Sequence, residues 1–197
     1  MYRLIMDTAL DYYYLVLMKD DLVLSETYEK GNSNHSEALM PKLKEVIENE
    51  KIGLKDIEEV YIGIGPGSYT GVRVACVIGK MIGAMNKIKA YSFSSLSLLA
   101  SSIESESYPF IDCRRGNAYI SHFVYENGLL KRVMEDKVVK VSEYFNDGTS
   151  KLIIKEGKPN PLTLIKSDEV KLVEDINALS PNYLQLVEAE RIKKGLL

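Results

Sequence analysis

The sequence contains no tryptophan, only two cysteines and only two histidines among its 197 residues. The cysteines, Cys76 and Cys113, are too few for the disulfide framework of a small secreted protein, so we expect a reducing compartment and a cytoplasmic location. The histidines, His35 and His122, do not form an HxxxH or HExxH pair of the kind that binds zinc. The sequence therefore predicts neither a disulfide scaffold nor a metal site.

A long hydrophobic run is also missing. Crossing a membrane takes about 18 consecutive apolar residues, and the most apolar stretch, residues 72–85, is interrupted by Arg73 and Lys80. Near the N-terminus, Asp7 stands where a signal peptide needs its apolar segment. We therefore expect neither a targeting segment nor a membrane-spanning one.

Basic residues are not in excess, since 25 Lys and Arg face 28 Asp and Glu for a formal net charge of -3. A basic face normally supplies most of the affinity for nucleic acid, so the chain is not expected to bind RNA by itself. Its 46% hydrophobic and 27% charged residues indicate a globular protein. A chain of this length can bury a real core as one domain or two small lobes.

Strand and helix patterns alternate in an order typical of an α/β protein. Residues 2–8 and 12–28 read as three strands of a meander, and they are followed by a helix at 35–51, a strand at 60–65 and a helix at 70–86. The Ser- and Glu-rich segment 101–109 is the best boundary. The sequence thus predicts an N-terminal lobe, residues 1–104, and a smaller C-terminal lobe, residues 105–197, with strands, a hairpin and a terminal helix after Pro181.

Three consecutive tyrosines, Tyr12, Tyr13 and Tyr14, occupy one of the predicted strands. Successive side chains of a strand point to opposite faces, so only alternate rings can share a core. The run could form an aromatic platform for a cofactor, but ordinary strand packing is the favoured interpretation.

The segment "GIGPGSYTGVR", residues 63–73, lies between a predicted strand and a predicted helix. It is not a Walker A loop, because no lysine follows its last glycine, and its glycines do not fit the G-x-G-x-x-G dinucleotide pattern. Backbone amides near Gly67 and Ser68 could bind an anion. Equally, the glycines could permit close backbone contact. Asp7, at the end of the first strand, could hold Mg²⁺ or could be an ordinary turn residue.

The helix at 70–86 carries Ala75, Gly79 and Gly83 at four-residue spacing. Each interior glycine costs about 0.5 to 1 kcal/mol of helix stability relative to alanine, so the stripe predicts a compensating close approach. The neighbour could belong to the same domain or to a partner chain. A reactive role for Cys113 beside Arg114 is not expected, because no histidine lies near it in sequence to act as a base.

Several segments together resemble one family. The strings "HSEALMP", "GIGPGSYTGVRVACVIGKMIG", "SFSSLSLLA", "DCRRGNAY" and "SPNYL" occur in the order and spacing of the bacterial TsaB (YeaZ) proteins. The resemblance covers most of residues 1–190, and its glycine-rich and "DCRRGNAY" strings are highly specific.

The resemblance implies a two-lobed α/β fold of the actin, sugar kinase and Hsp70 type (ASKHA, ribonuclease H-like) with a reduced second lobe. It also implies a non-catalytic subunit of tRNA N6-threonylcarbamoyladenosine formation, which binds and stabilises the catalytic subunit TsaD beside an ATPase partner, TsaE. Such a subunit forms homodimers when alone and meets tRNA only in the complex, without a membrane. It needs no cofactor by itself, although ATP or ADP could bind at the junction with TsaD.

The same resemblance places the partner interface on the first helix and on the helix after the glycine-rich turn. The interface residues expected there are His35, Glu37, Thr70, Arg73, Ala75, Gly79 and Gly83.

Parts of a nucleotide site are missing from the pattern. Asp7 is followed by "TALDYYY" without a glycine, the second lobe has "DCRRGNAY" in place of a D-x-G-G loop, and the histidine pair of TsaD has no counterpart. Asp7, Gly67 and Ser68 are the weak candidates for cofactor binding. Cys113, where alanine is usual, Gln185, where arginine is usual, and a short second lobe depart from the family. The alternative is a small-molecule kinase or ATPase that acts alone through Asp7 and the glycine-rich turn; proteolysis is not expected.

Overall fold

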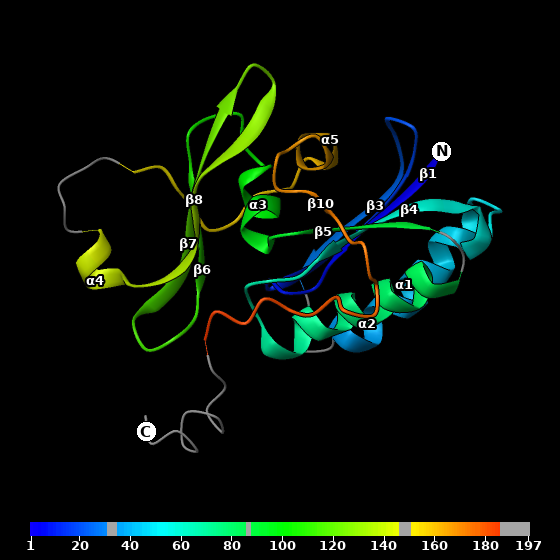
Figure 1. Cartoon of the computed structure of the whole chain (residues 1–197), viewed down its shortest axis with the longest axis horizontal. Coiled ribbons are helices and arrows are strands. Elements are labelled where there is room, and N and C mark those ends of the chain that lie inside the picture. Colours follow the sequence, from blue (N-terminus) through cyan, green and yellow to red (C-terminus); the bar gives the residue numbers. More distant parts are fainter. Residues whose placement is uncertain (31–34, 86–87, 146–150, 186–197) are drawn as a thin grey trace.

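The computed structural model describes residues 1–30, 35–85, 88–145 and 151–185 and contains two β-sheets with helices beside and between them (Figure 1). The first part of the chain forms β1 (Tyr2–Asp7), β2 (Tyr12–Lys19), β3 (Leu22–Lys30), α1 (His35–Asn49), the 3-10 turn η1 (Leu54–Asp56), β4 (Ile57–Gly63), α2 (Tyr69–Met85), β5 (Lys89–Phe93) and α3 (Ser95–Ala100). The second part forms β6 (Tyr108–Asp112), β7 (Asn117–Glu126), β8 (Leu129–Lys140), α4 (Val141–Tyr144), β9 (Ile153–Ile154), α5 (Pro161–Ile165) and β10 (Lys171–Leu172).

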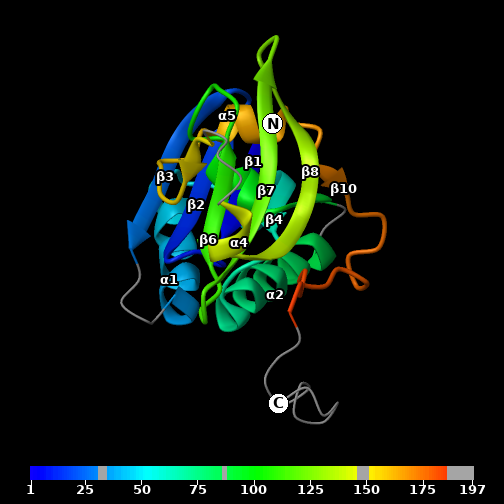
Figure 2. The ribbon, with the colours of Figure 1, turned by 90° about the vertical axis from the view of Figure 1, so that its left-hand side faces the viewer.

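The larger sheet has six strands in the order β10-β5-β4-β1-β2-β3. β1, β2 and β3 pair antiparallel, which confirms the predicted meander, while β1, β4 and β5 pair in parallel. Parallel neighbours need a crossover connection, and α2 provides the one between β4 and β5. Both α1 and α2 lie on one face of this sheet (Figure 2).

Apolar side chains alternate between the two faces of the larger sheet. In β2, Tyr13 packs in the core beneath α1 and α2, whereas Tyr12 and Tyr14 pack on the opposite face. In β1, Leu4 packs on the face of Tyr13 and Ile5 packs on the face of Tyr12 and Tyr14. Because a strand has a period of two, both faces can be buried only if both are covered by helices.

The smaller sheet has four strands in the order β8-β7-β6-β9. Helix α3 lies between the two sheets (Figure 1), with Leu98 packed against the larger sheet and Leu96 packed with Phe123 of the smaller one. Ser94 caps α3 by accepting a hydrogen bond from the Leu96 amide at 3.1 Å. The same hydroxyl donates to Asp136 of β8 at 2.6 Å, which ties the helix start to the smaller sheet.

The C-terminal segment returns to the larger sheet. β10 pairs antiparallel with β5, and Leu164 of α5 is buried in the core on the face of Tyr12. The described residues of the predicted C-terminal lobe, 105–145 and 151–185, are therefore shared between the two sheets. The sequence analysis missed α5, although Asn160 before Pro161 is a helix-start signal: the Asn160 side chain caps the Leu162 and Thr163 amides.

The predicted terminal helix does not begin within residues 181–185, which have no regular structure, and its remainder lies outside the described residues. Among the described residues, no helix has the length and apolar character needed to span a bilayer.

Candidate functional site

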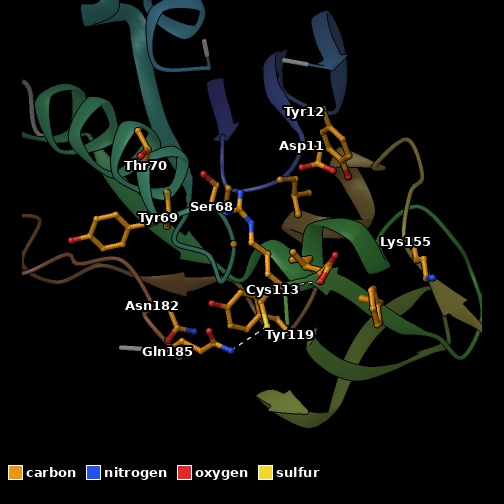
Figure 3. Close-up of a pocket in the computed structure, with 18 of the residues that line it drawn as sticks. Asp11, Tyr12, Ser68, Tyr69, Thr70, Cys113, Tyr119, Lys155, Asn182 and Gln185 are labelled. Atoms are coloured by element: carbon orange, nitrogen blue, oxygen red, sulfur yellow. Dashed lines mark hydrogen bonds between the residues drawn. The ribbon is translucent and has the colours of Figure 1, made fainter. Parts of the chain in front are cut away.

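A cleft between the two sheets forms a cavity of about 960 Å³ (Figure 3). Its walls come from the β1–β2 loop, the end of β3, the start of α2, the β6–β7 turn and the segment around residues 182–185. The glycine-rich turn and the "DCRRGNAY" string, which are far apart in sequence, therefore face the same space. A cavity at the junction of two structural layers is the usual place for a ligand site.

Asp7 is the last residue of β1, and its side chain is buried and does not reach the cleft. Its side chain is 1% exposed and does not line the cavity. Its carboxylate accepts hydrogen bonds from the Ser95 hydroxyl at 2.5 Å and from the Ala9 amide at 2.7 Å. Gly63 packs directly against it, since a Cβ at Gly63 would overlap the carboxylate. The oxygens that Mg²⁺ would need are thus engaged by groups of the chain itself.

Burial raises the pKa of Asp7 to about 6, although the hydrogen bonds from Ser95 and the Ala9 amide lower it. The folded chain therefore holds this proton more tightly than the unfolded chain does. The stability that the protonated form contributes is lost as pH rises through about 6. From an ordinary carboxyl pKa of 3.8, the loss of stability amounts to about 3 kcal/mol between about pH 4 and pH 7.

An Asp7→Asn variant is expected to lack this pH dependence, because asparagine cannot ionise. Chemical denaturation at a series of pH values would measure the difference in unfolding free energy between variant and wild type. We expect the stability of Asp7→Asn to increase relative to wild type as pH rises. The control Asp11→Asn, at an exposed position, should keep the wild-type dependence of stability on pH. A constant difference across the range would show that Asp7 is not protonated in the folded chain at mild pH.

The glycine-rich turn is packed against the β1–β2 loop. The Ser68 amide donates to the Ala9 carbonyl at 2.7 Å, and a Cβ at Gly67 would overlap the same carbonyl. A Cβ at Gly71 would overlap the Thr8 carbonyl, and the Thr8 hydroxyl donates to the Gly71 carbonyl at 2.5 Å. Of the two interpretations of this turn, close backbone contact is the one that the structure supports. The Ser68 amide, a candidate for anion binding, already has a partner.

The C-terminal segment crosses over the same turn. The Asn182 amide donates to the Ile64 carbonyl at 2.7 Å. The Arg73 guanidinium donates to the Tyr183 hydroxyl at 2.7 Å and lies 3.8 Å from the centre of the Tyr69 ring. Arg73, predicted to contact a partner, thus holds the C-terminal segment against the first turns of α2.

Two positions that depart from the family pattern contact each other. The Gln185 side-chain amide donates to the Cys113 sulfur at 3.2 Å, at the lower edge of the cleft in Figure 3. The two departures therefore belong to one contact between the β6–β7 turn and the C-terminal segment. The contact could not be predicted from the sequence, because 72 residues separate Cys113 from Gln185.

Metal binding finds no support in the described part of the chain, where no three His, Cys, Asp or Glu side chains lie close enough to hold an ion. His122 is instead 2.7 Å from Glu106 and stacks on Tyr108 with ring centres 4.3 Å apart. His122 therefore packs and pairs within the smaller sheet and its neighbouring loop.

The small-residue stripe of α2 faces the chain itself. Ala75 and Gly79 are buried, and a Cβ at Gly79 would overlap Ile62 of β4. A Cβ at Gly83 would lie 2.9 Å from Ile176. The close approach predicted from the stripe is therefore made within the chain. Ala75 and Gly79 were also predicted to contact a partner, but the larger sheet covers both of them.

The other predicted interface residues differ in exposure. Glu37 and Thr70 are exposed, and the side chain of His35 lies outside the described set. The sequence analysis missed the exposed side chains Val77, Met81 and Met85, which share the outer face of α2. The sequence did contain a signal for this face, because apolar residues recur there at a spacing of four while the opposite side of the helix is also apolar.

Comparisons with known proteins agree on one group. A family model described as TsaD, tRNA N6-adenosine threonylcarbamoyltransferase, matches residues 25–180. The tRNA threonylcarbamoyladenosine biosynthesis protein TsaB of Bacillus subtilis is 27% identical over 207 aligned residues, which cover 89% of this chain and 90% of that protein.

Two solved structures share the fold. A Pseudomonas aeruginosa protein described as similar to the peptidase YeaZ superposes with a TM-score of 0.79 at 17% identity, covering 93% of this chain and 99% of the other. YeaZ from Pseudomonas aeruginosa superposes with a TM-score of 0.66 at 21% identity, covering 71% of this chain and 67% of the other. These likenesses confirm the predicted fold class.

Proposed function

This chain belongs to the family described as TsaD, tRNA N6-adenosine threonylcarbamoyltransferase, and we propose that it is a non-catalytic subunit that binds and stabilises a catalytic TsaD-type subunit. The similarity to TsaB (YeaZ) proteins that the sequence predicts is confirmed by relatives of that name. Those relatives take part in tRNA threonylcarbamoyladenosine biosynthesis.

The observation that carries the proposal is the apolar stripe on the outer face of α2, formed by Val77, Met81 and Met85. Val77 is 58% exposed although the helix is packed on the sheet along its opposite side. Helix α1 lies beside α2 and adds the exposed Met40 (Figures 1 and 2). Contiguous apolar side chains on a helical surface are typical of protein interfaces, and methionine is enriched there.

The contacts at the cleft support a subunit without its own phosphoryl chemistry. Phosphoryl transfer needs a carboxylate that can reach Mg²⁺ and backbone donors aimed at phosphate oxygens. Here the Asp7 carboxylate accepts from Ser95 and Ala9, and the Ser68 amide donates to Ala9. The residues at these positions are used to join β1, α2 and α3.

In the proposed assembly, the α1–α2 face binds the catalytic subunit and, when that subunit is absent, a second copy of the chain. A TsaE-type ATPase joins the assembly elsewhere, and ATP or ADP could bind at the junction with the catalytic subunit. The formal net charge of -3 fits a subunit that meets tRNA only through the complex.

A matched pair of variants tests the surface. Val77 on α2 and Val133 on β8 are 58% and 57% exposed, so glutamate at either position should leave the fold intact. Val77→Glu would bury a charge in the proposed interface and should weaken binding to the cognate catalytic subunit about 100-fold or more. Val133→Glu should leave binding unchanged.

Binding can be measured by calorimetry, and threonylcarbamoyl transfer to tRNA by the reconstituted complex. Transfer supported by Val77→Glu should fall to the level of the catalytic subunit alone. Equal binding by Val77→Glu and Val133→Glu would contradict the proposed surface. Turnover of Mg-ATP by the isolated chain, abolished in Asp7→Ala, would contradict the non-catalytic role.

A further inference from the structure

Two exposed tyrosines and an arginine form a cluster where the C-terminal segment crosses the start of α2 (Figures 1 and 2). The rings of Tyr69, the first residue of α2, and Tyr183 have centres 5.2 Å apart and are 41% and 45% exposed. The Arg73 guanidinium lies 3.8 Å from the centre of the Tyr69 ring and 5.8 Å from that of Tyr183. Tyrosine and arginine are among the residues most enriched in the hot spots of protein interfaces.

The two tyrosines hold the guanidinium in one orientation. Its Nε donates to the Tyr183 hydroxyl at 2.7 Å, and its Nη2 donates to the Tyr69 hydroxyl. A free arginine side chain loses rotamer freedom when a partner immobilises it, and this loss weakens binding. Because Arg73 is already fixed within the chain, a partner that contacts it meets a preorganised group.

The positive charge of Arg73 has no carboxylate partner in the described part of the chain, whereas Arg3 and Arg132 form ion pairs with carboxylates. The Nη1 group of Arg73 also has no hydrogen-bond partner among the described residues. A guanidinium stays charged and presents a fork of donors that matches a carboxylate. Helix α2 contains no Asp or Glu that could use this fork. The remaining donors thus suit a carboxylate from another molecule.

The cluster is continuous with the apolar stripe of Val77, Met81 and Met85. Residues four apart are neighbours on a helix surface, so Arg73 lies one turn before Val77. A partner that covers Val77 must therefore also approach the guanidinium and remove it from water. A charge buried at an interface is favourable only when the partner supplies an opposite charge. The position of Arg73 therefore calls for a carboxylate on the partner's surface.

We infer that Tyr69, Arg73 and Tyr183 form an anchor that receives a carboxylate of the catalytic subunit at one end of the α1–α2 face. This inference rests on the proposed function, because it takes that face as the binding surface. Nη1 would donate to the carboxylate, and the two rings would pack on the apolar groups around it. The C-terminal segment thereby takes part in recognition through Tyr183. The adjoining apolar stripe and the net charge of -3 favour a protein over RNA as the source of the anion.

Association and dissociation rates of the full chain with its cognate catalytic subunit, measured for wild type and Arg73→Gln, test the inference. Glutamine keeps a planar amide but removes the charge and the fork. We expect Arg73→Gln to weaken binding about 30-fold, mainly through faster dissociation, because a desolvated charge pair acts on that rate. The control Lys131→Gln, which removes a cation from the strand of Val133, should bind like wild type. Equal binding by the two variants, or a change in the association rate alone, would overturn the inference.

Tyr183→Phe separates recognition from a purely structural role of the cluster. It removes the hydroxyl that accepts from Nε, but it leaves the charge, both rings and Nη1 in place. We therefore expect it to weaken binding only about threefold. A loss as large as that of Arg73→Gln would show that Arg73 only fastens the C-terminal segment to α2.

Val77→Glu distinguishes a failure of this inference from a failure of the proposed function. If Val77→Glu binds like wild type, the face itself is wrong and the anchor falls with it. If Val77→Glu weakens binding and Arg73→Gln does not, the face stands and only the anchor is wrong. If Arg73→Gln binds the catalytic subunit normally but weakens the binding of tRNA by the assembled complex, the anion is an RNA phosphate and the inference is overturned.

Discussion

Replacing Gly79 by valine is expected to lower the free energy of unfolding by about 3 kcal/mol or more, because the new side chain has no room. A Cβ at this position would already overlap the fully buried Ile62 of β4. Close packing lets few neighbours move, so α2 would have to shift from the sheet. For a chain of this size we expect a fall in melting temperature of roughly 10 °C, measurable by calorimetry.

Two further variants separate crowding from helix propensity. Gly83→Ala, whose Cβ would lie 2.9 Å from the half-buried Ile176, should cost much less than Gly79→Ala. Ile62→Val removes the methyl group nearest to Gly79. The double variant Gly79→Ala, Ile62→Val should therefore lose less stability than the sum of the losses in the two single variants. Strict additivity would show that Gly79 does not pack on Ile62.

Replacing Arg132 by methionine is expected to cost about 3 to 5 kcal/mol, because it leaves buried carboxylates without their cation. The guanidinium of Arg132 in β8 lies 3.2 Å from Asp136 and forms a closer ion pair with Glu169. All three side chains are largely buried, and Asp136 also accepts from Ser94, the cap of α3. The cluster thus joins the smaller sheet to α3 and to the segment before β10.

The control for Arg132→Met is Lys140→Met, which removes an exposed ion pair with Glu143 and should leave the free energy of unfolding almost unchanged. The Arg132→Met deficit should also depend on pH. Burial raises the pKa of Asp136 and Glu169 while Arg132 lowers it. Without Arg132 both carboxylates protonate more readily, so the deficit should be smaller at about pH 5 than at about pH 8. A deficit below about 1 kcal/mol at both pH values would contradict a buried cluster.

Local patterns predicted the elements whose causes are local. The meander β1–β3, the strand β4 and the helix α2 follow from apolar periodicity and turn residues. The alternating faces of Tyr12 and Tyr13 follow from the geometry of a strand alone.

Features that depend on distant segments could not be read in the same way. The small-residue stripe predicted a close neighbour for Gly79, but only the packing of α2 on β4 identifies it as Ile62. Asp7 stands where a ligand carboxylate would be useful, and its closure depends on Ser95, 88 residues away. The pairing of β10 with β5 involves two residues in each strand, which is too short for a sequence pattern.

In the proposed assembly, the outer face of α1 and α2 binds the catalytic subunit, and the same face binds a second copy of the chain when that subunit is absent. Sedimentation of the purified chain, alone and with increasing amounts of its cognate TsaD-type subunit, tests it most directly. We expect a homodimer that is replaced by a heterodimer, with both species lost in Val77→Glu and retained in Val133→Glu. A complex in which the homodimer of this chain stays intact through the α1–α2 face while the catalytic subunit binds would contradict it.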